Sequence, residues 1–425
     1  MASVTVTGNQ TIPSSLYGPD FTVLQNALTS LAGDYTSSNT FVDKSPTVAP
    51  QVGLNIYEID SKTVSTFVSP NLAGAVNEVL VLGQKAVSIT GGSSTRLVAG
   101  AGGNDTIRLS GGTGTVIGGQ GANVVSVSKG TYTVSGESGA DAISVADANV
   151  NVTNAAYHDT LQISGHSNVT VSSRNAAPSY IKVTVASGYG TLQMGNGAVS
   201  VGSGAAERIT AVAQRLDVTH TGTKGLDIVV SSPTGFGLYN ISGAAVIHET
   251  AAGGYNLNLT GPDTVYLGAG HDTITETGSA TVYGGSGLLK YTGGTGNDYI
   301  RLGSGPSTVI AGSGSDTIIA QSGASKIVAG SGADYIQVGR GNATITAGSG
   351  SDTVVFSKAY GGSQSVINNF VQGQDHIDLK TGGYAKTDIV SVKQAGGSTI
   401  IKLDDGTKIT LKNFTSPLSN SDFGF

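Results

Sequence analysis

Apolar residues recur every nine positions toward the C-terminal end of the chain. From Gly293 to Val355 the sequence divides into seven segments, GGTGNDYIR, LGSGPSTVI, AGSGSDTII, AQSGASKIV, AGSGADYIQ, VGRGNATIT and AGSGSDTVV. The eighth position of every segment is Ile or Val, and the fourth is always Gly. Glycine favours tight turns and β-branched residues favour strands, so each segment predicts one turn and one short strand of a repetitive β coil.

The sixth position of these segments alternates between aspartate and a small neutral residue, so two consecutive segments make one coil. One edge of the predicted coil stacks aspartates about 4.8 Å apart, and these are Asp298, Asp316, Asp334 and Asp352. The opposite edge stacks Ser307, Ser325 and Ala343. Carboxylates at this spacing repel one another, which predicts a cation between them, and Ca²⁺ prefers such oxygen ligands. We expect no ion on the serine edge. The alternative is a metal-free β-helix with solvated aspartates.

The same period appears nearer the N-terminus with poorer turns. Ten apolar rows keep the nine-residue spacing: Leu80, Ile89, Val98, Ile107, Val116, Val125, Val134, Ile143, Val152 and Leu161. Two residues before alternate rows stand Asp105, Asn123, Asp141 and Asp159. We expect a roll of the same geometry with few or weak ions, Asp141 with Asp159 being the best candidate pair. The alternative is that apolar stacking alone holds these coils together.

Between residues 172 and 262 the register drifts, although strand-like pieces persist in YIKVTVA, GTLQM, AVSVG, RLDVTH, LDIVVS and YNLNLT. These pieces predict a continued but irregular solenoid. The clear pattern resumes at Asp263 and Asp272. A one-residue deletion near Ala280 places Asp272, a further candidate calcium ligand, on the edge opposite Asp298.

Both ends of the chain carry segments that predict covers for the solenoid, whose open strand edges would otherwise invite aggregation. Residues 19–33 predict one helix, with Phe21, Leu24, Leu28 and Leu31 on one face. We expect residues 1–75 to cap the first coil, or alternatively to dock another subunit. Near the C-terminus, STIIKLDDGTKITLKNF predicts a hairpin with Asp405 and Gly406 at its turn.

Composition narrows the class of protein. Gly accounts for 64 of 425 residues and charged residues for 12%, which suits many short strands joined by turns. With 38% hydrophobic residues and a net charge of −6, a disordered chain is disfavoured. The absence of Cys excludes disulfides and thiolate sites. We expect no cleavable signal peptide, no transmembrane segment and no nucleic-acid partner, because the basic and apolar runs these need are missing.

The nonamers resemble the RTX (repeats-in-toxin, hemolysin-type) calcium-binding repeat G-G-x-G-x-D-x-U-x, which GGTGNDYIR matches in full. The resemblance implies a right-handed parallel β-roll that binds Ca²⁺. The segment VINNFVQGQDHIDL (366–379) resembles the stretch that closes such rolls, and the terminal SDFGF resembles a type I secretion signal. Together these features imply export by a type I secretion exporter and calcium-dependent folding outside the cell.

The resemblance also implies a ligand set for each ion. In the family, one turn gives its second and fourth carbonyls and its Asp, and the equivalent turn of the next coil gives its first and third carbonyls and its Asp. Carried over, the first site uses Gly294, Gly296, Asp298, Ala311, Ser313 and Asp316. The second uses Gly312, Gly314, Asp316, Ala329, Ser331 and Asp334. The third uses Gly330, Gly332, Asp334, Ala347, Ser349 and Asp352.

We therefore predict an all-β parallel β-roll with a small N-terminal helical cap and a C-terminal hairpin cap. The expected segments are a cap or docking segment (1–75), a degenerate roll (76–171), an irregular solenoid (172–262), a calcium-binding roll (263–355), and a C-terminal cap with secretion signal (356–425).

No protease or serine-hydrolase motif is present, and we expect no enzyme. The one candidate catalytic group, for a polysaccharide lyase or epimerase, is Arg208, Arg215, Asp217, His220 and Lys224. The sequence favours a secreted, extracellular or cell-surface structural protein that self-assembles with further copies of itself into a layer, sheath or filament. The first alternative is an adhesin or a module that binds cell-surface polysaccharide, and the second is a polysaccharide lyase or epimerase.

Overall fold

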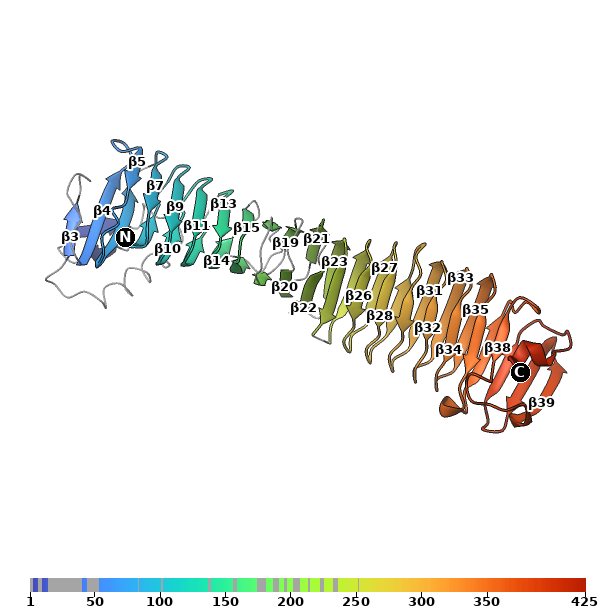
Figure 1. Cartoon of the computed structure of the whole chain (residues 1–425). Helices are drawn as coiled ribbons and strands as arrows, with labels where there is room; N and C mark the ends of the chain where they lie inside the picture. Colours follow the sequence, from blue (N-terminus) through green and yellow to red (C-terminus); the bar gives the residue numbers. More distant parts are fainter. Residues whose placement is uncertain are drawn as a thin grey trace. The chain divides into compact units, whose positions relative to one another are not determined.

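The computed structural model describes residues 3–6, 10–13, 40–43, 53–82, 84–100, 102–136, 139–155, 159–173, 181–185, 191–194, 197–201, 207–212, 215–221, 225–231, 236–250 and 252–425. The chain forms two compact units, the first made mainly of residues 1–212 and the second mainly of residues 225–425. Each unit is a parallel β-solenoid in which strands lie side by side along the coil (Figure 1).

In the first unit, strands from β4 onward alternate between two parallel sheets, so that a strand pairs with the strand two places further along the chain, as β10 does with β12 and β11 with β13. The strand β3 pairs directly with β4. The strands are β1 (Ser3–Val6), β2 (Gln10–Pro13), β3 (Thr40–Asp43), β4 (Gly53–Asp60), β5 (Thr66–Val68), β6 (Ala75–Leu82), β7 (Ser88–Gly91), β8 (Thr95–Ala99), β9 (Thr106–Ser110), β10 (Thr113–Ile117), β11 (Val124–Ser128), β12 (Thr131–Ser135), β13 (Ala142–Ala146), β14 (Asn149–Ala155), β15 (Thr160–Ser164), β16 (Asn168–Ser173), β17 (Ile181–Val185), β18 (Thr191–Met194), β19 (Gly197–Val201) and β20 (Glu207–Val212). The strands β1 and β2 form a separate antiparallel pair.

The second unit repeats this alternation. Its elements are β21 (Arg215–His220), β22 (Leu226–Ser231), β23 (Phe236–Ser242), β24 (Ala245–Glu249), β25 (Gly254–Leu259), β26 (Asp263–Tyr266), β27 (Asp272–Glu276), β28 (Ala280–Tyr283), β29 (Leu289–Thr292), β30 (Tyr299–Arg301), β31 (Ser307–Ser313), β32 (Thr317–Ile319), β33 (Ser325–Ser331), β34 (Tyr335–Val338), β35 (Ala343–Ser349), β36 (Thr353–Phe356), η3 (Lys358–Tyr360), β37 (Gln364–Asn368), β38 (His376–Asp378), η4 (Lys386–Asp388), β39 (Ile389–Ala395), β40 (Ser398–Leu403), β41 (Lys408–Leu411) and η5 (Asn420–Phe423).

Strand register confirms the prediction that two segments make one coil. Val116 of β10 pairs with Val134 of β12, which pairs with Val152 of β14. In the second unit, Ile300 of β30 pairs with Ile318 of β32. The ten predicted N-terminal rows are all buried, as are the seven eighth-position residues of the C-terminal block. Burial of each such side chain contributes roughly 1.5–3 kcal/mol, so these rows form the core along which the turns are stacked.

The predicted one-residue deletion near Ala280 is confirmed. Asp263 pairs with Ala280 and Asp272 pairs with Leu289, so each of these coils is one residue shorter than two full segments. Asp272 begins an odd-numbered strand, whereas Asp298 precedes an even-numbered one, which puts the two residues on opposite edges. The six strand-like pieces predicted between 172 and 262 are all strands.

The structure tests the predicted cap at the C-terminus more fully than the predicted cap at the N-terminus. The predicted helix at 19–33 lies outside the described residues. Within the predicted cap of residues 1–75, β4 already pairs with β6 in parallel over eight residues, so the coils begin earlier than the boundary at 75. The predicted C-terminal hairpin is present as β40 and β41, which are antiparallel and connected through Gly406 at a φ of 87°. The strand β41 also pairs with β37 and so covers the last coil.

Candidate calcium-binding ladder

The four predicted aspartates of the second unit stand one above another at the starts of consecutive even-numbered strands. The backbone N–H of Asp298 donates to Oδ1 of Asp316 at 2.8 Å, and that of Asp316 donates to Oδ1 of Asp334 at 2.8 Å. The N–H of Asp334 donates to Oδ1 of Asp352 at 3.0 Å. Each carboxylate is therefore fixed by the coil before it, and all four face the same way; we call them the aspartate ladder.

The second carboxylate oxygen of three ladder residues has no hydrogen-bond partner among the described residues. The three buried oxygens are Oδ2 of Asp316, Oδ2 of Asp334 and Oδ2 of Asp352. Burial, with a further contribution from neighbouring carboxylates, raises the pKa of Asp316 and of Asp352 to about 6. Burial also raises the pKa of Asp334. A buried carboxylate without a counter-charge is costly, so these oxygens suit a cation.

The turns before these aspartates direct backbone carbonyls at the same place. Gly330 and Gly332 have φ angles of 111° and 133°, which glycine adopts without strain. A Cβ on either residue would overlap the carbonyl oxygen of Gly312 or Gly314, one coil earlier. Those two carbonyls therefore point at the following turn, as the second predicted ligand set requires. Ca²⁺ takes such carbonyl and carboxylate oxygens together.

The third predicted site is built in the same way. Gly348 and Gly350 have φ angles of 104° and 123°, and a Cβ on them would overlap the carbonyl oxygens of Gly330 and Gly332. The N–H of Gly332 donates to the Ser349 carbonyl at 2.9 Å, which holds the two turns in register. The second and third ligand sets thus consist of oxygen donors of the kind that Ca²⁺ takes, and their glycine carbonyls point at the following turn.

The first predicted site is built differently, although its turn GGTGND matches the repeat in full. Gly294 and Gly296 do not have positive φ angles, unlike the equivalent glycines of the later turns. The Tyr291 hydroxyl donates to Oδ2 of Asp298 at 2.7 Å, so this oxygen has a partner. The full match to the repeat motif therefore does not give this turn the glycine conformations of the later turns.

The first unit carries a shorter ladder of the same kind. The N–H of Asp141 donates to Oδ1 of Asp159 at 2.8 Å, so the structure brings the predicted pair together. Oδ2 of Asp141 is buried without a hydrogen-bond partner among the described residues, and burial raises the pKa of Asp141 to about 7. Residues 137–138 and 156–158, which belong to these turns, lie outside the described residues.

Asn123 interrupts this shorter ladder with an amide. Its Nδ2 donates to Oδ1 of Asp141 at 3.0 Å and to the Gly121 carbonyl at 3.2 Å. An amide donor thereby contacts the same kinds of oxygen that a calcium ion would bind. Asp105 lies one coil earlier, with its Oδ2 also buried and unpartnered among the described residues.

Asp272 lies on the opposite edge of the second unit, where sequence reasoning missed its neighbour Glu249. Oδ1 of Asp272 accepts from the N–H of Tyr255 at 3.1 Å, and Oε2 of Glu249 accepts from that of Gly268 at 3.2 Å. Burial, and then the charge of Asp272, raises the pKa of Glu249 to about 8. The only feature of the sequence that could have indicated Glu249 is that it stands at the first position of a turn.

The candidate catalytic residues of β21 do not lie on one face of the strand. On β21, Arg215 and Asp217 form an ion pair of 3.3 Å on the outer face, whereas His220 faces inward and is 5% exposed. Arg208 belongs to the other unit, and Lys224 lies outside the described residues. Among described residues, no three His, Asp or Glu side chains gather closely enough to form a metal site by themselves. The ladder would instead combine two carboxylates with carbonyls.

Comparisons with known proteins agree with this geometry. The family model of the RTX calcium-binding nonapeptide repeat matches four stretches, at residues 97–125, 259–275, 292–327 and 328–357. Comparison with curated proteins and with solved structures gave no match. In the described part of the chain, no helix is long and apolar enough to cross a membrane. The chain thus carries the RTX nonapeptide repeat in four copies, and such repeats bind calcium ions.

Proposed function

We propose that this chain is a secreted calcium-binding structural protein, which folds on calcium outside the cell and then assembles with further copies of itself. The two ligand sets around Asp334 support calcium-dependent folding. An ion between stacked turns can bind only when those turns are folded against each other, so its binding energy stabilises the coil. Extracellular calcium at millimolar levels would supply the ion after export by a type I exporter.

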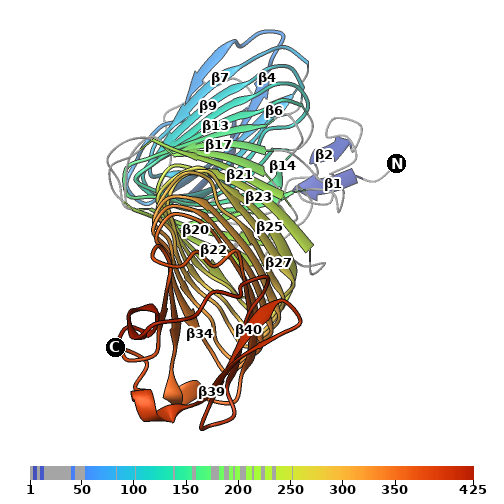
Figure 2. The same cartoon turned by 90° about the vertical axis from the view of Figure 1, so that its right-hand side faces the viewer.

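The observation that carries the assembly proposal is the strand β39 at the C-terminal end. It pairs with β40 in antiparallel fashion, and no other described strand pairs with its second edge. Figure 2 shows β39 and β40 beside each other at this end. Val390 and Val392 on β39 are 65% and 44% exposed. An open edge with exposed valines is a template for pairing with a strand of another chain.

The test combines negative-stain microscopy with sedimentation of the full chain, in millimolar Ca²⁺ and in chelator. We expect ordered filaments or sheets with Ca²⁺ and none in chelator. The variant carrying Val390→Lys and Val392→Lys should remain folded but lose assembly, because lysines protect an open strand edge. Val371→Lys is the matched control, since Val371 is 46% exposed but lies outside β39. A wild-type chain that stays monomeric in Ca²⁺, or a double variant that assembles normally, would refute the assembly proposal.

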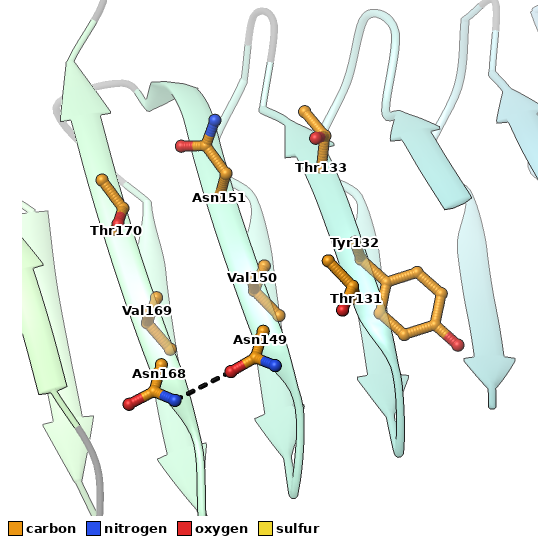
Figure 3. Close-up of a pocket in the computed structure, with 9 residues that line it drawn as sticks. All are labelled: Thr131, Tyr132, Thr133, Asn149, Val150, Asn151, Asn168, Val169 and Thr170. Carbon is orange, nitrogen blue, oxygen red and sulfur yellow. Dashed lines mark hydrogen bonds between the residues drawn. The ribbon is translucent and has the colours of Figure 1, made fainter. Parts of the chain in front are cut away.

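A second candidate function, binding of cell-surface polysaccharide, is favoured by a shallow hollow on the first unit that carries two rows of polar side chains. Thr131, Asn149 and Asn168 form one row across β12, β14 and β16. A parallel row, two residues further along each strand, consists of Thr133, Asn151 and Thr170 (Figure 3). These uncharged hydroxyls and amides both donate and accept hydrogen bonds, as sugar hydroxyls require.

A glycan array probed with the full chain tests this second function. Binding that is lost on replacing Asn149 and Asn151 by Ala, with no assembly in Ca²⁺, would favour an adhesin over a self-assembling protein. No glycan binding by the wild-type chain would remove this candidate.

A further inference from the structure

The turn between β27 and β28 lacks the aspartate that begins the neighbouring even-numbered strands. Asp263 pairs directly with Ala280, and Ala280 in turn occupies the place that Asp298 has one coil later. The RTX model also skips this turn, since its matches end at residue 275 and resume at 292. By the repeat pattern alone, the line of carboxylates on this edge is broken at Ala280.

Glu276 stands at the other end of the same turn and places a carboxylate inside it. Its position corresponds to Gly293 one coil later, because Thr275 pairs with Thr292. A Cβ on Gly293 would lie 2.5 Å from Oδ2 of Asp298, so a side chain at this position points toward the sixth residue of its own turn. The turn that starts at Glu276 is one residue shorter, so the residue equivalent to Asp298 is its fifth, Ala280, which is small enough to leave room for a carboxylate.

The Glu276 side chain is buried, and only one of its two carboxylate oxygens accepts hydrogen bonds from described residues. It is 1% exposed, and its Oε1 accepts from the N–H groups of Thr277 and Gly278 at 2.9 and 2.6 Å. Oε2 is buried and has no hydrogen-bond partner among the described residues. The charged side chains that act on Glu276 are the carboxylates of Asp263 and Asp298, both repulsive. Three carboxylates with this burial need a counter-charge.

One backbone carbonyl, that of Gly278, points toward the next turn. A Cβ on Gly296 would overlap the carbonyl oxygen of Gly278, whereas one on Gly294 would lie about equally near the oxygen, the Cα and the carbonyl carbon of Thr277. The Gly278 carbonyl therefore approaches Gly296 in the way that the Gly314 carbonyl approaches Gly332. The gap between the two turns therefore offers the Gly278 carbonyl oxygen together with the carboxylates of Glu276 and Asp298.

We propose that this gap is a further calcium site, in which Glu276 supplies from the first position of its turn the carboxylate that the repeat normally supplies from the sixth. The site rests on the proposed calcium-binding ladder and extends it by one coil beyond Asp298. The edge then carries an unbroken series of carboxylates from Asp263 to Asp352. The hydroxyl of Tyr291 shares Oδ2 of Asp298 with the ion.

Crystals of the full chain grown with terbium(III), which prefers the same oxygen ligands as Ca²⁺, test this site directly. An anomalous difference map is expected to show a peak between residues 276–280 and 293–298, in addition to peaks beside Asp334. Peaks beside Asp334 without one at Glu276 would overturn the further site and leave the ladder standing. No peak at any turn would instead overturn the calcium ladder itself.

Calcium counting in solution gives the second readout. Equilibrium dialysis of the full chain should show one ion fewer per chain for Glu276→Gln than for the wild type. Asp404→Asn removes the same charge from an exposed side chain away from the ladder, and it should leave the number of bound ions unchanged. Equal stoichiometry for Glu276→Gln and the wild type would contradict the proposal.

Discussion

At the scale of single residues, Asp334 belongs to two predicted ligand sets because it lies between two stacked turns. Replacing Asp334 by Asn keeps the shape of the side chain but removes the charge that both ions require. We expect this variant to bind two calcium ions fewer than the wild type, as measured by isothermal titration calorimetry. Ser325→Ala is the control on the opposite edge and should bind as many ions as the wild type. If Asp334→Asn binds as many calcium ions as the wild type, Asp334 is not shared between two sites and the proposed geometry is contradicted.

The glycines of the ladder turns make a separate prediction about stability. In Gly332→Ala, the new Cβ would overlap the Gly314 carbonyl oxygen at a φ of 133°. Gly383→Ala is the control, because Gly383 also has a positive φ, of 89°, but no atom lies near its added Cβ. The control should lower the free energy of unfolding by about 1–2 kcal/mol. Gly332→Ala should lower it by roughly 1–3 kcal/mol more, which urea denaturation in Ca²⁺ can measure.

Sequence reasoning could find the ladder aspartates because their regular spacing, one in every second segment, follows from the coil itself. It could not find Glu276 or Glu249, since neither residue stands at the repeat position that carries carboxylates. Both became visible through burial and through unpartnered oxygens, which depend on how the short turns fold. The same limit applies to Asp298, whose hydrogen bond from Tyr291 crosses from a neighbouring strand.

At the scale of secondary-structure elements, the ladder predicts an unusual response to pH. Burial raises the pKa of Asp316 and of Asp352 from 3.8 to about 6. Between these values the folded chain binds protons more tightly than the unfolded chain, so the free energy of unfolding falls as the pH rises. In chelator, the chain should therefore melt at a higher temperature near pH 5 than near pH 7.

Calcium should reverse this trend, because the ion binds the deprotonated carboxylates. Melting curves followed by circular dichroism at both pH values, with Ca²⁺ and with chelator, check the prediction. A chelated chain that is more stable near pH 7 than near pH 5 would contradict the picture of buried carboxylates lacking a counter-charge.

The strands themselves were predictable to a large extent. The nine-residue rows identified the buried positions, because a strand in a coil must place its β-branched residues inward at every turn. Turn conformation was not predictable from glycine content alone. GGTGND and AGSGAD both carry glycine at the second and fourth positions, yet only the later turns have positive φ angles at both.

At the scale of the whole molecule, the five predicted segments remain a prediction, whereas backbone packing divides the chain into two units. The N-terminal boundary could not be derived from the rows, because β4 pairs with β6 over eight residues without the repeat motif. The C-terminal cover was easier to predict. An Asp-Gly turn between two alternating apolar stretches specifies a hairpin locally, and the structure places it against β37.

The central claim is that the carboxylates of this solenoid are compensated by calcium, so that the ion controls folding. Far-ultraviolet circular dichroism of the full chain during a Ca²⁺ titration, starting from the chelated state, tests this claim most directly. We predict that the β signal and the melting temperature both rise as Ca²⁺ reaches millimolar concentration. An identical β signal and melting temperature with Ca²⁺ and with chelator would contradict the account.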